Sequence, residues 1–364
     1  MDAALSNKTV LKTKQHFKIL DGLRGIAAIA VVIFHFMEFA VPDYKDNFIA
    51  HSYLAVDFFF CLSGFVIAYA YDSKIESIGL VRFIQLRLIR LHPLVVIGAL
   101  LGLLTFIFDP FSNLYQKYGL GKALLMFLSA GLLIPYPQIP ERYFNLFHLN
   151  PPTWSLFWEY IANIFYVFIL YKIKDRLLWV LVVIGALVIC YVAWHVGNLG
   201  VGWGAGNFLG GGVRIFYSFL AGMLVYRANW VIKSSLGFAA MSILLAAVFF
   251  IPFSDQFNRV TDPVVVIFYF PFLVALGAGA SFQAGFDKIC RFFGDISYPL
   301  YMTHAPFLWI FLSYVETKKP PMNELVYIII ISLFLLIGLA YLIMVFLDQP
   351  IRKYFSTKMK KSSN

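Results

Sequence analysis

Two ionisable side chains, Arg24 and His35, lie within one apolar stretch, residues 19–37, ILDGLRGIAAIAVVIFHFM. On a helix they would lie about 16 Å apart along the axis and on nearly the same face. Ionisable groups are costly in hydrocarbon and usually face a bundle interior or a watery cavity. An imidazole titrates near neutrality and can take a proton from a hydroxyl or hold an acyl group. We expect Arg24 at the cytoplasmic mouth of a cavity and His35 as its reactive centre, or else a His35 hydrogen-bonded to a neighbouring helix.

A second pair of basic side chains, Arg87 and Arg90, stands at i, i+3 within residues 80–94, LVRFIQLRLIRLHPL. The mixture of apolar and basic residues is typical of a helix lying in the cytoplasmic membrane interface. The two arginines either anchor that helix to anionic lipid or bind an anionic substrate from the cytosol. Guanidinium groups match phosphate geometry, so the phosphates of coenzyme A would fit. The spacing alone does not choose between these readings.

Further polar residues recur inside apolar runs. Asp57 either snorkels to water or orients a histidine or a substrate hydroxyl, and Glu159 is either a structural hydrogen-bond partner or a substrate or proton ligand. His304 lies between two prolines, which often mark a distorted helix lining a cavity. Asp348 either caps the last helix beside Arg352 or takes part in catalysis. The pair Ser63-Gly64 favours close helix packing.

The composition is that of a membrane protein. The 364 residues are 61% apolar and 13% charged, with a mean hydropathy of +0.78, whereas soluble domains hold about 25% charged residues. The net charge of +10 comes from Lys and Arg at the ends of apolar runs, so we expect membrane lipid and no nucleic acid as a partner. Three cysteines, each in or beside an apolar run, predict neither a disulfide framework nor a metal cluster.

Eleven apolar runs follow one another, and the placement of basic residues orders them across the membrane. If ten runs cross and one between 93 and 171 does not, every basic cluster lies inside. The weakest candidate is 119–134, which contains three glycines and is followed by the breaker PYPQIP. We therefore predict an all-α polytopic bundle of about ten spans, an interfacial basic helix at 80–94, and a re-entrant or surface segment at 119–134. The expected parts are a cytoplasmic segment 1–18, a membrane domain 19–350 and a basic cytoplasmic tail 351–364. The runs are 19–41, 51–71, 93–108, 119–134, 154–171, 177–196, 212–227, 236–253, 263–281, 296–315 and 325–347.

Taken jointly and in order, these segments resemble the acyltransferase type 3 membrane proteins, which O-acylate sugars, lipids and natural products from an acyl-coenzyme A donor. The resemblance implies a ten-helix core and makes Arg24, His35, Arg87 and Arg90 the family's essential positions. The sequence departs from the family pattern where Asp348 replaces a closing Glu and where Pro151-Pro152-Thr153 replaces a segment that often holds a His. Many relatives carry an extra helix and a hydrolase-like domain, which we do not expect here. The matching segments are LDGLRGIAAIAVVIFHF (20–36), VDFFFCLSGF (56–65), RLIRLHPL (87–94), TWSLFWEYIANIFY (153–166), SYPLYMTHAPF (297–307) and DQP (348–350).

We therefore expect a polytopic O-acyltransferase of the bacterial inner membrane, with both termini in the cytoplasm. Acyl-coenzyme A, by family frequency acetyl-coenzyme A, would be held by Arg87, Arg90 and Arg24, with no metal. His35 would act as general base on a glycan, lipid-linked sugar or metabolite hydroxyl, or carry the acyl group. Asp57, Glu159 and His304 are candidates for orienting His35 or the acceptor. The rival interpretation is a transporter or flippase in which His35 and Glu159 couple to protons.

Overall fold

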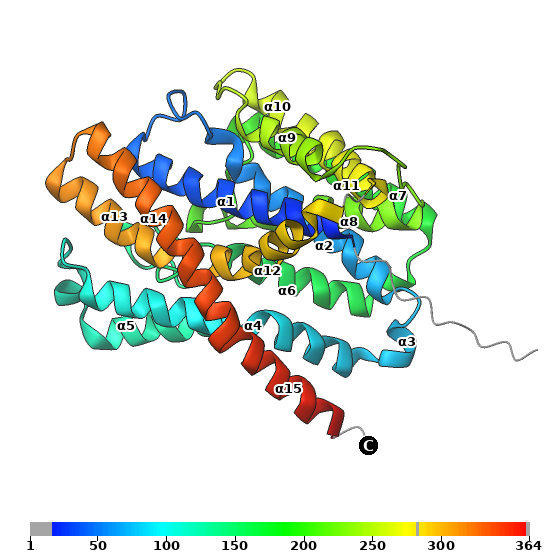
Figure 1. The fold of residues 1–364 in the computed structure, drawn as a ribbon, viewed down its shortest axis with the longest axis horizontal. Coiled ribbons are helices and arrows are strands. Elements are labelled where there is room, and N and C mark those ends of the chain that lie inside the picture. The colour runs from blue at the N-terminus through cyan, green and yellow to red at the C-terminus, as the bar shows by residue number, and fades with distance from the viewer. Residues whose placement is uncertain (1–16, 282–283, 362–364) are drawn as a thin grey trace, which may run out of the picture.

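The protein is a bundle of helices in the computed structural model, which describes residues 17–281 and 284–361. Within these ranges, extended structure is limited to two isolated bridges, Asn145 with Gly204 and Ser234 with Ala280. Figure 1 shows the helices packed into one body. The α-helices are α1 (Lys18–Ala40), α2 (Ala55–Tyr71), α3 (Ile75–Ile78), α4 (Leu80–Phe108), α5 (Leu114–Leu132), α6 (Thr153–Phe168), α7 (Asp175–Val196), α8 (Phe208–Arg227), α9 (Phe238–Phe249), α10 (Asn258–Val264), α11 (Phe270–Gly279), α12 (Asp287–Thr303), α13 (Ala305–Lys318), α14 (Met322–Ile343) and α15 (Gln349–Lys361).

Each predicted apolar run is largely helical, which confirms the all-α polytopic class. In the part of the chain that is described, seven helical stretches are long and apolar enough to cross a membrane. Other helices are short: α6 has 16 residues and α9 has 12. A 16-residue helix rises about 24 Å, less than the roughly 30 Å of a hydrocarbon core. The count of ten spans therefore stays a prediction. The seven stretches are Lys18–Ala40, Ala50–Tyr71, Leu80–Phe108, Asp175–Val196, Ala205–Arg227, Asn258–Gly279 and Met322–Lys361.

Two segments that we expect to be separate are continuous with the neighbouring helices. Residues 80–94 are helical but form the first half of the 29-residue helix α4, which continues through Pro93. Residues 351–361 of the expected tail belong to α15, which continues α14 through the π-helical segment Met344–Asp348. Of the expected terminal segments, residues 1–16 and 362–364 lie outside the described residues.

The segment expected at 119–134 lies in α5, beside α4 (Figure 1). At Gly119 the backbone takes φ 73°, which kinks α5 near its start. This left-handed conformation suits glycine because it has no Cβ. Whether α5 re-enters the membrane or lies on its surface remains a prediction.

The backbones of helices α2 and α8 lie in close contact. A Cβ added to Gly222 would lie 1.9 Å from the Cys61 carbonyl oxygen, and one added to Gly64 would lie 2.0 Å from that of Phe219. The predicted role of Ser63-Gly64 in close packing is thus seen directly. Asp72, the residue after α2, also pairs with Arg227 at the end of α8, with 2.7 Å between Oδ2 and Nε. Small residues let backbones approach closely, which is how helices associate in lipid.

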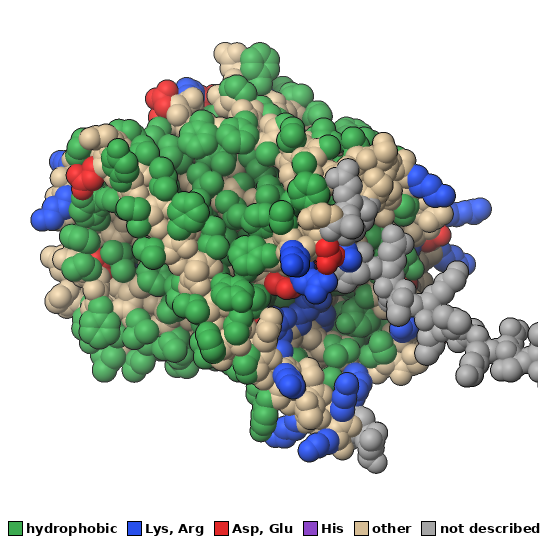
Figure 2. Space-filling model, viewed as in Figure 1, with side chains coloured by type: hydrophobic (Ala, Val, Ile, Leu, Met, Phe, Trp, Pro, Cys, Tyr) green, Lys and Arg blue, Asp and Glu red, His purple; other side chains and the backbone are tan. Residues whose placement is uncertain are grey.

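Hydrophobic side chains cover most of the face seen in Figure 2, as expected for a surface in contact with lipid. Lysine and arginine side chains gather over α15, at the end of the bundle away from the α13–α14 connection (Figures 1 and 2). The start of α1, at Lys18, lies near the start of α12, because Lys18 pairs with Asp287 at 2.5 Å. Basic residues at one end agree with the charge pattern that ordered the spans.

The close approach of α2 and α8 predicts that Gly222→Ala destabilises the protein, because the new methyl group meets backbone rather than a movable side chain. Overpacking of this kind costs about 1–3 kcal/mol. Gly338→Ala in α14 is the matched control, since no atom lies within 4 Å of its added Cβ. Thermal unfolding of both purified variants in one detergent measures the difference. Equal melting temperatures would show that α2 and α8 can separate without cost.

Candidate active site

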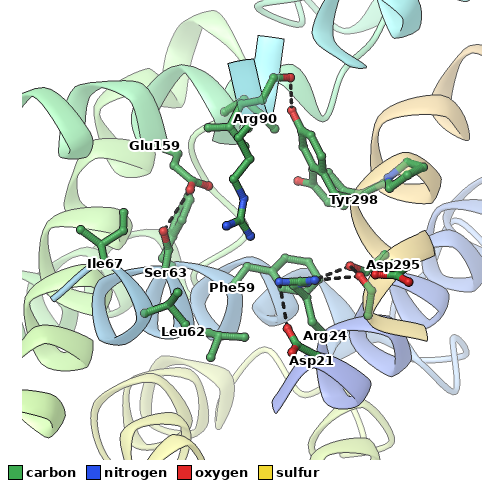
Figure 3. A pocket seen from close by; sticks show the side chains of 18 of the residues that line it. Asp21, Arg24, Phe59, Leu62, Ser63, Ile67, Arg90, Glu159, Asp295 and Tyr298 are labelled. Carbon is green, nitrogen blue, oxygen red and sulfur yellow. Dashed lines mark hydrogen bonds and ion pairs between the residues drawn. The ribbon is translucent and has the colours of Figure 1, made fainter. Parts of the chain in front are cut away.

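A cavity of about 610 Å³ lies among α1, α2, α4, α6 and α12. It runs from half-buried Lys18 and Asp287 at the end of the bundle to buried Ser155 and Tyr301 inside it. Its volume is within the range of about 300–1,000 Å³ that is typical of small-molecule sites. Figure 3 shows side chains from several helices converging on this space. The cavity thus reaches from the end of the bundle into the membrane domain.

Six basic and four acidic side chains line this cavity. The acidic ones largely neutralise the basic ones at its mouth, where Lys18 and Arg291 both pair with Asp287. Together they make a polar entrance to a deeper space with mostly apolar walls, including Phe59, Phe60 and Leu62. The basic residues are Lys18, Arg24, Arg87, Arg90, Arg291 and Arg352, and the acidic ones are Asp21, Glu159, Asp287 and Asp295.

Arg87 and Arg90 are brought together on this cavity, as their spacing predicted. The Arg90 side chain projects into the space between Glu159 and Phe59 (Figure 3). It makes no hydrogen bond or ion pair with any residue that the structure describes. Arg87 donates from Nη2 to Glu159 Oε1 at 3.0 Å, but its buried Nε has no acceptor. Unsatisfied guanidinium donors in one cavity are suited to an anionic ligand with several oxygen atoms.

Arg24 also lines the cavity but is held by protein groups. Its Nε donates to Ser297 Oγ at 2.8 Å and its Nη2 to the Gly294 carbonyl at 2.7 Å, both on α12. Asp21, one turn earlier, lies 3.4 Å from Nη1. Arg24 therefore joins α1 to α12 and adds a positive charge to the cavity with little freedom to move.

Glu159 lines the same cavity and accepts hydrogen bonds from two helices. Ser63 Oγ donates to its Oε1 at 2.9 Å, and Arg87 donates to the same oxygen. These bonds join α6 to α2 and α4, so Glu159 is a hydrogen-bond partner between helices, while its role toward a substrate stays a prediction. The same bonds place its carboxylate beside the arginines, where it limits their net charge.

His35 does not line this cavity, although its sequence position suggested the cavity centre. Its ring stacks on that of His304 with 5.6 Å between centroids, and the His304 ring lies 6.0 Å from that of Tyr301. Tyr301 is a wall residue of the cavity. The inner end of the cavity is therefore separated from His35 by the side chains of Tyr301 and His304. Helix spacing placed His35 correctly along α1 but could not show which side chains fill the space beside it.

The sequence reasoning missed Glu38, the partner of His35. His35 Nδ1 lies 3.1 Å from Glu38 Oε2, and the Tyr44 hydroxyl donates to the other carboxylate oxygen. A carboxylate on Nδ1 fixes the ring and leaves Nε2 as the acceptor for a substrate proton. The His35 side chain is 30% exposed, so Nε2 is not sealed in the core. The i, i+3 spacing of His35 and Glu38 was the available signal.

His304 sits at a break in the helix between α12 and α13, as its two flanking prolines predicted. Its Nδ1 donates to the Leu300 carbonyl at 3.0 Å, while its buried Nε2 has no partner in the described chain. Next to it, the Tyr301 hydroxyl lies 2.9 Å from Ser155 Oγ, which donates to the Pro152 carbonyl. Ser155 and Tyr301 line the inner end of the cavity, and His304 lies behind Tyr301.

Asp57 lies apart from this site and is bound by Arg214, which the sequence reasoning did not single out. Arg214 Nη2 donates to Asp57 Oδ2 at 2.6 Å, and its Nε lies 3.1 Å from the same oxygen. The remaining Arg214 donors go to the carbonyls of Tyr53 and Val201. Both side chains are buried, and no contact joins Asp57 to His35. Its contacts are those of a structural ion pair between α2 and α8.

Asp348 is buried and pairs with Arg352 one turn later, as the sequence position suggested, but it lies within the continuous helix from α14 to α15 and so does not cap a helix end. Arg352 in turn lines the mouth of the cavity. Among the described residues there is no group of three or more His, Cys, Asp or Glu side chains that could hold a metal ion.

Comparison with known proteins gives one family and several relatives. The model of the family described as the acyltransferase domain matches residues 17–345. A protein described as "Protein 2 in picA locus" from Rhizobium radiobacter is 36% identical over 162 residues, which cover 42% of this chain and 81% of that protein. "O-acetyltransferase OatA" from Staphylococcus aureus is 25% identical over 92% of this chain. The chain spans 57% of the length of that relative. No solved structure gives a significant match.

The buried Asp57–Arg214 pair predicts a stability effect that is separate from any chemistry. Asp57→Ala leaves a buried guanidinium without its carboxylate, and breaking such a pair costs about 3–5 kcal/mol. We expect a large drop in melting temperature, and partial recovery in the double variant Asp57→Ala with Arg214→Met, which removes the orphaned charge. Thermal unfolding measured by size-exclusion profiles checks both. A single variant as stable as the native protein would return Asp57 to the list of functional candidates.

Proposed function

Since the chain belongs to the acyltransferase-domain family, we propose that it moves an acyl group from an acyl-coenzyme A to a hydroxyl group on an acceptor. The family match covers nearly all of the helical bundle, so the chain is an acyltransferase and a multi-pass membrane protein. The similarity to an O-acetyltransferase supports oxygen as the acceptor atom and acetyl as the group transferred. The family gives no support to the transporter alternative.

The observation that carries the proposal is the cavity with unsatisfied arginine donors. Within the described part of the chain, Arg90 has no hydrogen-bond partner and the buried Nε of Arg87 has no acceptor, so both can hold phosphate oxygens of coenzyme A. Arg24, fixed by α12, contributes charge rather than new hydrogen bonds. The apolar wall formed by Phe59, Phe60 and Leu62 suits the uncharged arm that carries the thioester. When bound, the thioester supplies an activated acyl carbonyl.

His35 serves as the general base of this reaction. Glu38 holds Nδ1, and Nε2 takes the proton of the acceptor hydroxyl as the hydroxyl oxygen forms a bond to the acyl carbon. The bond from that carbon to sulfur breaks, and the sulfur leaves as the thiolate of coenzyme A, which takes up a proton. For this attack the thioester end of the donor must extend past Tyr301 and His304 toward His35, and rotation of these two side chains is the motion that we associate with transfer.

The charge pattern supports a placement in the bacterial plasma membrane with the arginine-lined cavity open to the cytoplasm. The tail helix α15 carries four lysines and one arginine, and the mouth of the cavity lies at the same end as Lys18 and Arg352. Coenzyme A thioesters would enter from that side. The relatives reported above come from bacteria, which supports the same placement. Acceptors reach His35 from the other side.

Arg90→Ala is expected to weaken binding of acetyl-coenzyme A about 10- to 100-fold, because it removes a charged hydrogen-bond donor worth about 1.5–3 kcal/mol. Arg176→Ala removes the same charge from an exposed position of α7 outside the cavity and serves as the control. Calorimetric titration in lipid nanodiscs at one ionic strength measures both affinities. Unchanged affinity in Arg90→Ala would rule out the arginine cavity as the donor site.

His35→Ala is expected to lower acyl transfer about 10²- to 10⁴-fold while donor affinity stays within about twofold, because a general base acts only in the chemical step. Glu38→Gln, which keeps the size of the side chain, should lower kcat by a smaller factor and leave the donor KM unchanged. The assay follows labelled acetyl groups from acetyl-coenzyme A into a panel of glycans, lipids and small hydroxyl compounds. Full transfer by His35→Ala would remove the imidazole from the mechanism.

A further inference from the structure

A second cavity, of about 250 Å³, lies at the opposite end of the bundle from the arginine-lined cavity. The connection from α4 to α5, the short helical turn Pro140–Arg142 and the end of α13 form its walls. Its lining is rich in hydroxyl, amide and charged groups. The volume is below the roughly 300 Å³ at which pockets for drug-sized ligands begin. It would accommodate a single small polar ring.

Arg142 is the distinctive residue of this second cavity. Its side chain is buried, with 4% of the residue exposed, and its guanidinium lies 4.2 Å from the centre of the Trp309 ring. It makes no side-chain hydrogen bond or ion pair within the described residues, and its Nη1 is a buried donor without an acceptor. Burial lowers the pKa of Arg142 to about 10, so the group stays charged at neutral pH. A buried guanidinium without hydrogen-bond acceptors is costly, and this points to a ligand.

The carboxylates around Arg142 indicate which kind of ligand the second cavity could bind. Asp109, Glu141 and Glu316 all interact electrostatically with Arg142 and favour its charged form, although none forms a hydrogen bond with it. Asp109 is occupied by the Ser313 hydroxyl at 2.7 Å. Hydrogen bonds from Lys117 and Tyr118 occupy Glu141 and lower its pKa to about 2. The carboxylates therefore compensate the charge of Arg142, but none of them accepts a hydrogen bond from its guanidinium.

We propose that this second cavity is a carbohydrate subsite that holds one neutral monosaccharide ring. Hydroxyl groups of the ring would accept hydrogen bonds from Arg142 and donate hydrogen bonds to Glu316. Glu316 is exposed and has no hydrogen bond or ion pair to another described residue. The hydroxyl groups of Ser112 and Thr317 extend the polar wall. An inorganic anion would be repelled by Glu141 and Glu316, so a polyhydroxylated group suits this cavity better than phosphate.

Two ring contacts connect the second cavity to α1 near the His35–Glu38 pair. Phe39, one turn along α1 from His35, stacks on Trp309 with 5.8 Å between ring centroids, and Trp309 supports Arg142. Burial raises the pKa of Tyr143, which follows Arg142, and the negative charges of Glu316 and Glu38 raise this pKa further. As the acceptor side of acyl transfer, this subsite rests on the proposed function. It makes the acceptor a glycan that approaches from the end of the bundle away from coenzyme A.

The test is a titration of the full chain in lipid nanodiscs with methyl glycosides of glucose, galactose and N-acetylglucosamine, followed by saturation-transfer NMR. We expect at least one glycoside to bind with a millimolar Kd. Arg142→Ala should weaken that binding at least tenfold, and Glu316→Gln should weaken it severalfold. Lys318→Ala removes a charge from the exposed end of α13 and should leave binding unchanged. Because Glu316 is exposed, we expect Glu316→Gln to fold, so its effect on glycoside binding tests the proposal even if Arg142→Ala does not fold.

Several results would overturn the subsite. These are absence of glycoside binding to the native protein, equal binding by the Arg142 and Glu316 variants, or displacement of the glycoside by inorganic phosphate at equal concentration. Acetyl-coenzyme A binding by each sample serves as an independent check. Native protein that binds a glycoside but not acetyl-coenzyme A would refute the proposed donor site and leave the subsite standing. The reverse result would refute the subsite alone.

Discussion

A guanidinium group inside a bundle of apolar helices needs acceptors for its donors, and this requirement shapes the protein. Removing the charge from water costs several kcal/mol unless carboxylates and carbonyls replace the water. Arg214 takes Asp57, and Arg227 takes Asp72 together with carbonyls of the α6–α7 connection. Both pairs join α2 to α8, one near each end, and the glycines between them let the backbones meet. Helices that lipid alone would not hold together are thereby fixed in one register.

Within the described chain, two arginines that lack such acceptors line the two cavities, one in each. Among the described residues, Arg90 has no hydrogen-bond or ion-pair partner in the larger cavity, and Arg142 has a buried donor without an acceptor in the smaller one. The cavities lie at opposite ends of the bundle, and α1 connects them, because Arg24 borders one and the His35–Glu38 pair lies near the other. One helix thus carries the groups that face both substrates of the proposed reaction. The distribution of unsatisfied donors is consistent with an enzyme that takes its two substrates from different sides.

Sequence patterns predicted much of this arrangement and missed specific partners. Hydropathy located the helical runs, and the pairing of Arg87 with Arg90 led to the larger cavity. Hydropathy could not show that residues 80–94 continue into the next run, since a proline normally interrupts a helix and Pro93 does not. In the sequence Asp57 is a candidate for chemistry because its partner is not visible. That partner, Arg214, is 157 residues away, and a single sequence does not reveal contacts at that separation. The contact of Glu38 with His35 is one that the sequence can indicate, because i, i+3 spacing puts both side chains on one helix face.

The layer formed by Tyr301 and His304 has a consequence for the cell. Two water-accessible hollows that open toward opposite sides of a bilayer would, if joined, give protons and small ions a conducting route. The aromatic ring of Tyr301 and the stacked imidazoles of His304 and His35 lie between the larger cavity and the His35–Glu38 pair. In the proposed reaction, where the two substrates enter from opposite sides, these rings would keep the two sides separate and so preserve the electrochemical gradient between turnovers.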